Sequence, residues 1–234
     1  MIGMGQLIIL GVFMLLSWIV GAQLKSRFRK YSQIPVNFGL TGKDVAERML
    51  RENGINDVRV VSVEGQLSDN YNPVEKTVNL SRDVYSGSNI SAAAVAAHEC
   101  GHAIQHAQAY AALKLRSALV PIQNISAQVM NFIFIAMIFG AFAFQRIFSF
   151  EIALMVIIAC YAIFTLFALV TLPVEINASQ RAIAWLSTSS VTGFNTLPQA
   201  KDALKWAAYT YVVAALSSLA MLLYYVFLFM GRRD

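Results

Sequence analysis

The chain has 234 residues, of which 57% are hydrophobic and only 13% are charged, and its mean hydropathy is +0.57. An ordinary soluble domain carries about 25% charged residues. This composition therefore excludes a typical soluble protein and predicts an integral membrane protein. The formal net charge is +5, and we expect the lipid bilayer, not a nucleic acid, to be the chain's surroundings and partner.

Three uncharged segments are long enough to cross a bilayer as helices. They are residues 1–24, 152–174 and 206–230, and each exceeds the roughly 20 residues that a helix needs to cross about 30 Å of hydrocarbon. A fourth segment is densely apolar over 129–144 and reaches that length if residues 118–124 extend it, with a bend at Pro121. We expect about four transmembrane helices.

The order of charges around the first segment predicts a retained anchor. A cleaved signal peptide carries its positive residues before the apolar core, whereas here they follow it, over 25–30. That basic run either is a solvated flank or rests on anionic headgroups. With the N-terminus outside, 15 of the 18 Lys and Arg residues lie inside, and the exceptions are Arg146, Arg232 and Arg233. We predict a multi-pass protein of a bacterial plasma membrane.

The segment between the first two spans has a mixed composition and is expected to face the cytoplasm. Thr41-Gly-Lys-Asp44 resembles a capping box, which predicts an amphipathic helix that ends near Asn53-Gly54. Residues 58–63 and 76–80 are rich in β-branched side chains and are joined by turn residues over 69–73, which predicts a two-stranded hairpin. Its edge can hold an extended peptide, or the hairpin only packs beneath a helix.

All three histidines lie between His98 and His106, and the first five residues of this window read H-E-x-x-H. An alanine-rich run before it predicts a helix with Ser91 as N-cap. On one helix His98 and His102 share a face and can bind one metal ion, while Glu99 can take a proton from the attacking water. The pattern indicates half of a zinc hydrolase site. The alternative is a chance match in which both histidines are hydrogen-bonded core residues.

A catalytic zinc usually has three protein ligands, and His106 is a poor third candidate. It lies roughly 12 Å from His98 along a continuous helix, too far for one ion. The pattern H-E-x-x-H-x-x-G-x-x-H bends the chain with a glycine, but Gln105 and Gln108 occupy its glycine and last histidine positions. We expect His106 to support the ligands, to contact the substrate or only to end the helix.

Glu175 is the better candidate, because it directly follows the third span. Two spans separate it from His102, so both lie on the same side of the membrane, whereas Glu151 belongs to the outer loop. Other acids on the correct side lack a comparable helical context: Glu64, Glu75, Asp83 and Asp202. Three polar residues after Glu175 can orient the ligands or bind substrate, or are structural: Asn177, Ser179 and Arg181. Cys100 and Cys160 are expected to be buried and unpaired.

Three segments together resemble the YugP-type membrane-bound neutral zinc metallopeptidases: H-E-C-G-H-A-I-Q-H, residues 66–73 and residues 172–182. The likeness covers nearly the whole chain. It implies a membrane zinc peptidase with His98 and His102 as ligands and Glu99 as the catalytic glutamate, and it supports Glu175 by analogy with glutamate-ligated zinc peptidases. The chain is also similar to membrane quality-control proteases, which often read E-x-x-x-D from the ligand glutamate. Here Ser179 stands at the last position, so the role of that aspartate does not carry over.

The expected function is a zinc metalloendopeptidase with one zinc ion per chain, acting on membrane proteins or their membrane-proximal loops. A donor to the oxyanion is required, and Tyr71, Tyr85, His106 and Arg181 are alternatives. A non-proteolytic scaffold stapled by zinc is the main rival, although structural zinc sites usually have four ligands. Transport is a weaker rival, since no charged residue lies within a confident span.

The expected fold is a predominantly α membrane protein with about four transmembrane helices and a small α+β zinc-protease domain that contains a short β-sheet. It divides into five parts along the chain. They are an anchor (1–24), a catalytic segment (25–117), a transmembrane hairpin (118–174), a third-ligand helix and loop (175–205) and a C-terminal transmembrane helix (206–234).

Overall fold

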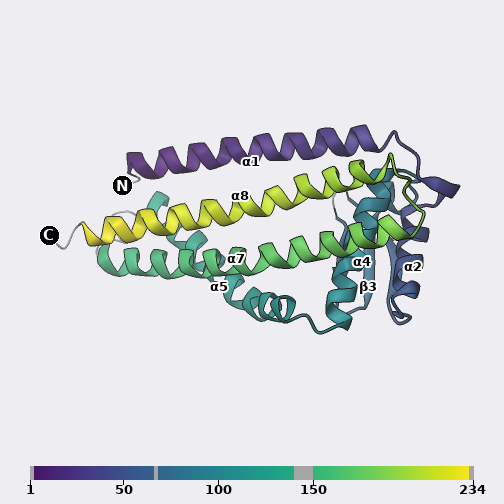
Figure 1. The fold of residues 1–234 in the computed structure, drawn as a ribbon. Helices are drawn as coiled ribbons and strands as arrows, with labels where there is room; N and C mark the ends of the chain where they lie inside the picture. Colours follow the sequence, from purple (N-terminus) through teal and green to yellow (C-terminus); the bar gives the residue numbers. More distant parts are fainter. Residues whose placement is uncertain (1–2, 66–67, 140–149, 232–234) are drawn as a thin grey trace. The chain divides into compact units, whose positions relative to one another are not determined.

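The computed structural model describes residues 3–65, 68–139 and 150–231. Four helices in these ranges are long and apolar enough to cross a membrane: α1 (Met4–Tyr31), α5 (Ala111–Phe139), α7 (Phe150–Thr188) and α8 (Leu197–Met230) (Figure 1). The predominantly α fold with about four membrane-spanning helices is therefore confirmed. Pro121 and Pro173 lie inside α5 and α7. The three basic residues predicted to lie on the outer side, Arg146, Arg232 and Arg233, fall outside the described residues.

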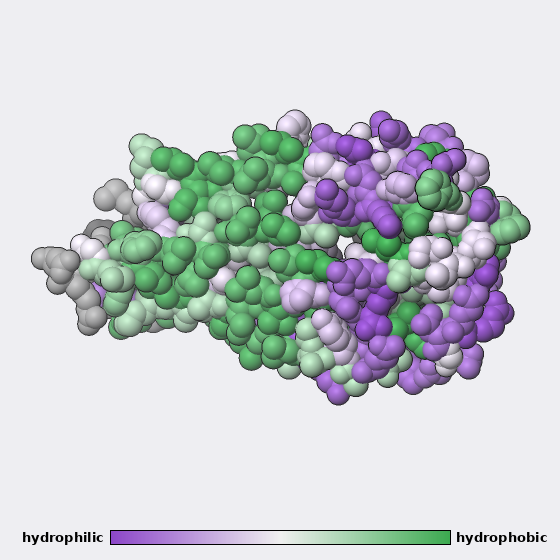
Figure 2. All heavy atoms as spheres, viewed as in Figure 1, coloured by the Kyte–Doolittle hydropathy of each residue, from purple (hydrophilic) through white to green (hydrophobic). Residues whose placement is uncertain are grey.

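The chain forms two compact units. The first, here called the helical unit, comprises Met1–Trp18, Leu115–Leu172 and Tyr211–Asp234. Its small core contains Leu154, Met221 and Tyr225, and many of its large apolar side chains are exposed. The side chains of Met14 and Trp18, for example, are 71% and 70% exposed. Hydrophobic residues cover its helices on the face drawn in Figure 2, as expected for helices that contact lipid.

The second unit, here called the α+β unit, comprises Ile19–Lys114 and Pro173–Thr210. Its helix α2 (Gly42–Glu52) starts with the predicted capping box: the Thr41 hydroxyl accepts from the Asp44 amide, and the Asp44 carboxylate accepts from the Thr41 amide at 2.8 Å. Asn53 forms the C-cap. The prediction for this helix is confirmed at both ends, because both caps depend on neighbours in the sequence.

The sheet has three strands, in the order β1 (Arg59–Val63), β3 (Thr77–Ser81), β2 (Asn70–Asn72). β1 and β3 pair in parallel, and β2 pairs antiparallel with β3. The predicted hairpin is therefore wrong, although the positions of its two strands are nearly right. The expected connector supplies a strand of its own, and Asp69 fixes that strand beside β3 by accepting hydrogen bonds from the Ser81 amide and hydroxyl.

Helix α4 (Ile90–Ala107) forms the centre of the α+β unit. Its N-cap is Asn89, whose side chain accepts from the Ala92 amide at 3.0 Å. The prediction of Ser91 is wrong, since Asn89 is the last extended residue and Ser91 already lies in the first turn, where its hydroxyl donates to the Phe28 carbonyl. The prediction for the cysteines is confirmed: Cys100 and Cys160 are buried and free.

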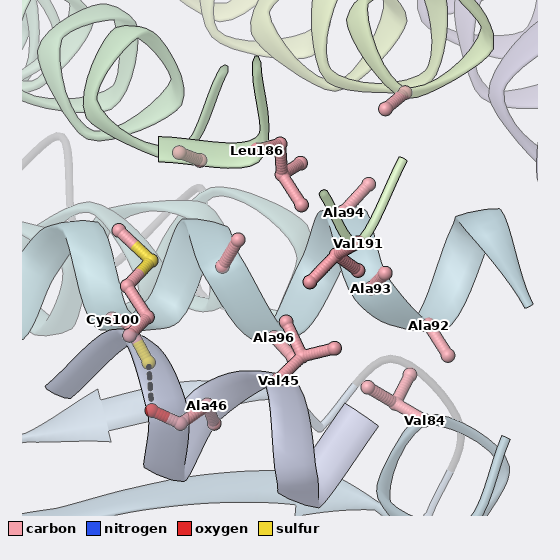
Figure 3. Close-up of a cluster of buried hydrophobic side chains, with 14 of the residues drawn as sticks. Val45, Ala46, Val84, Ala92, Ala93, Ala94, Ala96, Cys100, Leu186 and Val191 are labelled. Atoms are coloured by element: carbon pink, nitrogen blue, oxygen red, sulfur yellow. Dashed lines mark hydrogen bonds between the residues drawn. The ribbon is translucent and has the colours of Figure 1, made fainter. Parts of the chain in front are cut away.

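The alanines of α4 allow close packing on two sides. Figure 3 shows them between Val45 and Ala46 of α2 and the apolar side chains Leu186 and Val191. The Cys100 thiol lies 3.5 Å from the Ala46 carbonyl oxygen. Short side chains bring the backbones together, so the strong helix former alanine also serves the packing of α4.

The backbones of α4 and α7 approach each other closely at Gly101. A Cβ atom added there would lie 2.6 Å from the carbonyl oxygen and 3.0 Å from the Cα atom of Ala178. Because these are backbone atoms, they cannot move aside as the end of a flexible side chain would. Glycine is therefore required where the two helices cross.

We predict that Gly101→Ala lowers the apparent melting temperature of the detergent-purified protein, because the added methyl group forces the helices apart at a cost of about 1–3 kcal/mol. Gly21→Ala is the matched control: nothing lies within 4 Å of its added Cβ, and alanine is the better helix former by roughly 0.5–1 kcal/mol. Equal melting temperatures for the two variants would contradict the crossing at Gly101.

Candidate metal centre

Three side chains of the α+β unit converge from α4 and α7. Nε2 of His98 lies 3.2 Å, and Nε2 of His102 lies 3.4 Å, from Oε2 of Glu175. The ligand atoms of all three residues lie within 4.8 Å of one another. His98 and His102 come from successive turns of α4, as their spacing predicts.

The donor set fits a zinc ion. Zinc binds histidine nitrogen and carboxylate oxygen at about 2.0–2.2 Å, so two ligand atoms on one tetrahedral ion lie about 3.3–3.5 Å apart. The two separations from Glu175 match that requirement. His102 and Glu175 are buried, at 8% and 2% exposure. Two imidazoles and one carboxylate would leave the fourth position of a zinc ion open, as in catalytic zinc sites.

The other ring nitrogen of His98 contacts α7. Its Nδ1 lies 3.1 Å from the Ser179 hydroxyl, one helical turn after Glu175. Ser179 was predicted to orient a ligand, to bind substrate or to be structural, and its contact is with His98, one of the candidate ligands. A hydroxyl that bonds Nδ1 leaves Nε2 directed at Glu175.

The other ring nitrogen of His102 contacts Gln105, a residue whose role the sequence analysis missed. Nδ1 of His102 lies 3.0 Å from Oε1 of Gln105. The Gln105 amide nitrogen donates to the Val174 carbonyl at 2.8 Å and to the Asn177 side-chain oxygen at 3.0 Å. The sequence did offer one signal for this contact: Gln105 follows His102 by three residues, and this spacing places the two side chains on the same face of a helix.

Asn177 and Arg181 extend this network along α7. The Arg181 guanidinium donates to the Asn177 side-chain oxygen at 2.8 Å and to the Gln108 side-chain oxygen at 2.7 Å. Both residues therefore belong to the polar connection between α4 and α7. Neither is among the three clustered ligand residues.

Glu99 is buried beside the three candidate ligands, at 8% exposure. Burial raises the pKa of its carboxyl above the ordinary value, since removal from water disfavours the charged form. The nearby His98 and His102 lower that pKa in part, whereas Glu175 and Asp69 raise it. An environment that brings a carboxyl pKa closer to neutrality suits a group that both accepts and releases a proton.

His106 lies outside the cluster, in the last turn of α4. Its Nδ1 lies 2.9 Å from the hydroxyl of Tyr71 on β2. Tyr85 lies apart from this pair, at the end of α3 (Arg82–Tyr85), with the Lys43 ammonium 5.8 Å from its ring centroid. The structure thus separates two tyrosines that the sequence could not distinguish.

The other acids considered as ligands have different places. Glu64 pairs with Arg82, and Asp202 accepts from Arg27 and Tyr31. Glu151 lies in the first turn of α7. Within the described ranges, the cluster of possible metal ligands contains His98, His102 and Glu175, without Glu75, Asp83 or any of these acids.

Comparisons with known proteins agree with this chemistry. The profile of a family described as "Putative neutral zinc metallopeptidase" matches residues 6–230. The chain is also 40% identical over 220 residues to the "Putative membrane protease YugP" of Bacillus subtilis (strain 168), and the match covers 94% of each protein. No solved structure matches the chain. The match over nearly all of the sequence confirms the predicted resemblance, and the chain belongs to the YugP-type family of neutral zinc metallopeptidases.

Proposed function

We propose that this protein is a membrane zinc metalloendopeptidase that holds one zinc ion with His98, His102 and Glu175. The observation that carries the proposal is the meeting of these three side chains beside a buried Glu99. Two imidazoles, one carboxylate ligand and an adjacent carboxylate are the parts of a glutamate-ligated zinc hydrolase.

Zinc at this position would supply Lewis acidity, which lowers the pKa of water from 15.7 to about 7 and polarises the scissile carbonyl. The protein's own part is proton transfer and orientation. Glu99 accepts the proton of the attacking water and passes it to the leaving amine. Ser179 and Gln105 hold the imidazoles of His98 and His102 in place through their Nδ1 atoms.

Tyr71 is the best placed donor to the developing oxyanion. It pairs across the sheet with the buried Val78 and so shares its sheet face, and its hydroxyl is held by His106. His106 lies on the same face of α4 as Glu99 and His102, at intervals of seven and four residues. Arg181, by contrast, belongs to the polar connection between α4 and α7 through its bonds to Asn177 and Gln108.

The sheet next to α4 suggests how a substrate binds. β2 lies at the edge of the three-stranded sheet, and α4 packs against it. A peptide that adds to this edge would be held by backbone hydrogen bonds, with little dependence on its side chains. The edge would accept extended, unfolded segments of many sequences.

We further propose that the substrates are membrane proteins or their membrane-proximal loops, cleaved on the cytoplasmic side of a bacterial plasma membrane. Glu175 lies on the same helix as an apolar span, since α7 runs from Phe150 to Thr188. The basic residues that follow the first span support an inward-facing α+β unit through the positive-inside tendency.

The alternative is a scaffold in which zinc only joins α4 to α7. A structural zinc site is normally closed by four protein ligands. Three ligands are clustered among the described residues, and a scaffold has no use for the adjacent buried Glu99. The enzyme is therefore the better interpretation.

Replacing Glu99 by Gln should leave zinc binding intact and slow cleavage of an unfolded reporter protein by about 10²- to 10⁴-fold, because the amide cannot accept the water proton. Glu47→Gln, on the exposed surface of α2, is the matched control and should cleave like the wild type. A zinc chelator should stop cleavage by the wild type and by Glu47→Gln. Unchanged cleavage by Glu99→Gln would refute the proposed mechanism.

Replacing Glu175 by Ala should abolish binding of one zinc ion per chain, since it removes the only carboxylate of the cluster. The control is Glu151→Ala on the same helix, which should bind zinc as the wild type does. Zinc content after dialysis, measured by elemental analysis, tests both variants. Full zinc occupancy in Glu175→Ala would mean that the third ligand is another residue.

Tyr71→Phe should lower kcat by about 10- to 1,000-fold with little change in KM, because the hydroxyl acts on charge that develops only in the transition state. Tyr85→Phe removes the same atom from α3 and should leave kcat unchanged. Steady-state kinetics on a peptide substrate distinguish the two. Equal kcat values would exclude Tyr71 as the oxyanion donor.

A further inference from the structure

We infer that Gln105 determines which nitrogen of His102 is available to zinc, and that it couples this histidine to the turn of α7 that carries Glu175. The inference rests on the proposed zinc site and adds a positioning residue to it. Gln105 is fully buried, at 0% exposure, and its amide group makes three hydrogen bonds in the α+β unit.

The orientation of the Gln105 amide follows from its partners. One end lies 2.8 Å from the Val174 carbonyl oxygen, which can only accept, so that end must be the NH₂ group. Its second partner is the Asn177 side-chain oxygen, 3.0 Å away. That atom must be an oxygen, because it also accepts from the Arg181 guanidinium, which can only donate.

The Gln105 oxygen is therefore the atom that faces His102. Since an amide oxygen only accepts, Nδ1 of His102 must carry the hydrogen of their 3.0 Å contact. A neutral imidazole has one N–H group, which leaves Nε2 with a free lone pair. Nε2 is the atom that lies 3.4 Å from the Glu175 carboxylate, where the zinc ion would bind.

His98 lacks a partner of this kind. The Ser179 hydroxyl at its Nδ1 can either donate or accept, so it fits both neutral forms of the ring. The fixed proton position is thus a property of His102 and Gln105. Val174 and Asn177, the residues that Gln105 contacts on α7, lie on either side of Glu175 in the sequence.

Two substitutions distinguish positioning from a purely structural role. Gln105→Met keeps the length of the side chain but removes the acceptor for His102, whereas Gln105→Glu keeps an acceptor there. Both remove the amide donor to Val174 and should lower the melting temperature. We expect Gln105→Met to weaken zinc binding by about 10- to 100-fold, as loss of a ligand's supporting hydrogen bond does, and Gln105→Glu to stay within about threefold of the wild type.

The measurement is the zinc dissociation constant of the full-length protein in detergent, by competition with a chromogenic chelator. Gln108→Met is the control, since Gln108 contacts Arg181 and no ligand. Equal zinc affinities for Gln105→Met and the wild type would overturn the inference. Equal losses in Gln105→Met and Gln105→Glu, parallel to their melting temperatures, would also overturn it.

A second measurement needs no substitution at Gln105. The chain has three histidines, so ¹⁵N-histidine labelling gives few ring signals, and His106→Gln helps to assign them. In the zinc-loaded protein we expect the His102 proton on Nδ1, protected from exchange with water. Coordination through Nδ1 would overturn the inference. Neither measurement uses a peptide substrate, so a protein that binds zinc in this way but cleaves nothing would refute only the peptidase.

Discussion

The site depends on one contact between backbones, the crossing of α4 and α7 at Gly101. His98 and His102 lie three residues before and one residue after this glycine, and Glu175 lies three residues before its neighbour Ala178. A Cβ atom at 101 would overlap the Ala178 backbone, so a larger residue would separate the helices. The ligand distances of 3.2 and 3.4 Å therefore depend on a residue that has no side chain.

Burial raises the electrostatic cost of bringing His98, His102 and Glu175 together where the helices cross. A carboxylate and two imidazole lone pairs that face each other repel unless a cation lies between them, and burial strengthens that repulsion. His102 reflects the conflict: burial would lower its pKa, but the hydrogen bond to Glu175 and the charge of Glu99 raise it above the ordinary value. A proton on His102 would relieve the repulsion. One zinc ion would relieve it better, because it would satisfy all three proposed ligands, so an arrangement that is costly without a cation would favour zinc binding.

The parts of this structure that could be predicted from sequence are those with local causes. The helix of the H-E-x-x-H motif follows from its alanines, the α2 capping box from residues three apart, and the membrane spans from uncharged runs. Glu175 could be chosen by counting spans. Three features could not be predicted: the central place of β3, the Asn89 cap and the role of Gln105. The place of β3 and the role of Gln105 depend on partners far away in the chain, and the cap depends on the exact end of the preceding loop. In the sequence analysis, Gln105 was considered only as the residue that replaces the glycine of the H-E-x-x-H-x-x-G-x-x-H pattern. In the structure, the Gln105 side chain joins α4 to α7 by hydrogen bonds.

Ser179 occupies the position at which the sequence analysis considered an aspartate of the E-x-x-x-D pattern. An aspartate at this position would hold the ligand histidine through a carboxylate, which makes the imidazole more basic. Here a neutral hydroxyl contacts His98, and a neutral amide contacts His102. Neither partner adds negative charge beside the cluster, whose single carboxylate is Glu175. Zinc bound by fewer negative charges keeps more of its own positive charge. A zinc ion at the proposed site would therefore polarise its substrate more strongly, and packing and neutral hydrogen bonds would orient its ligands.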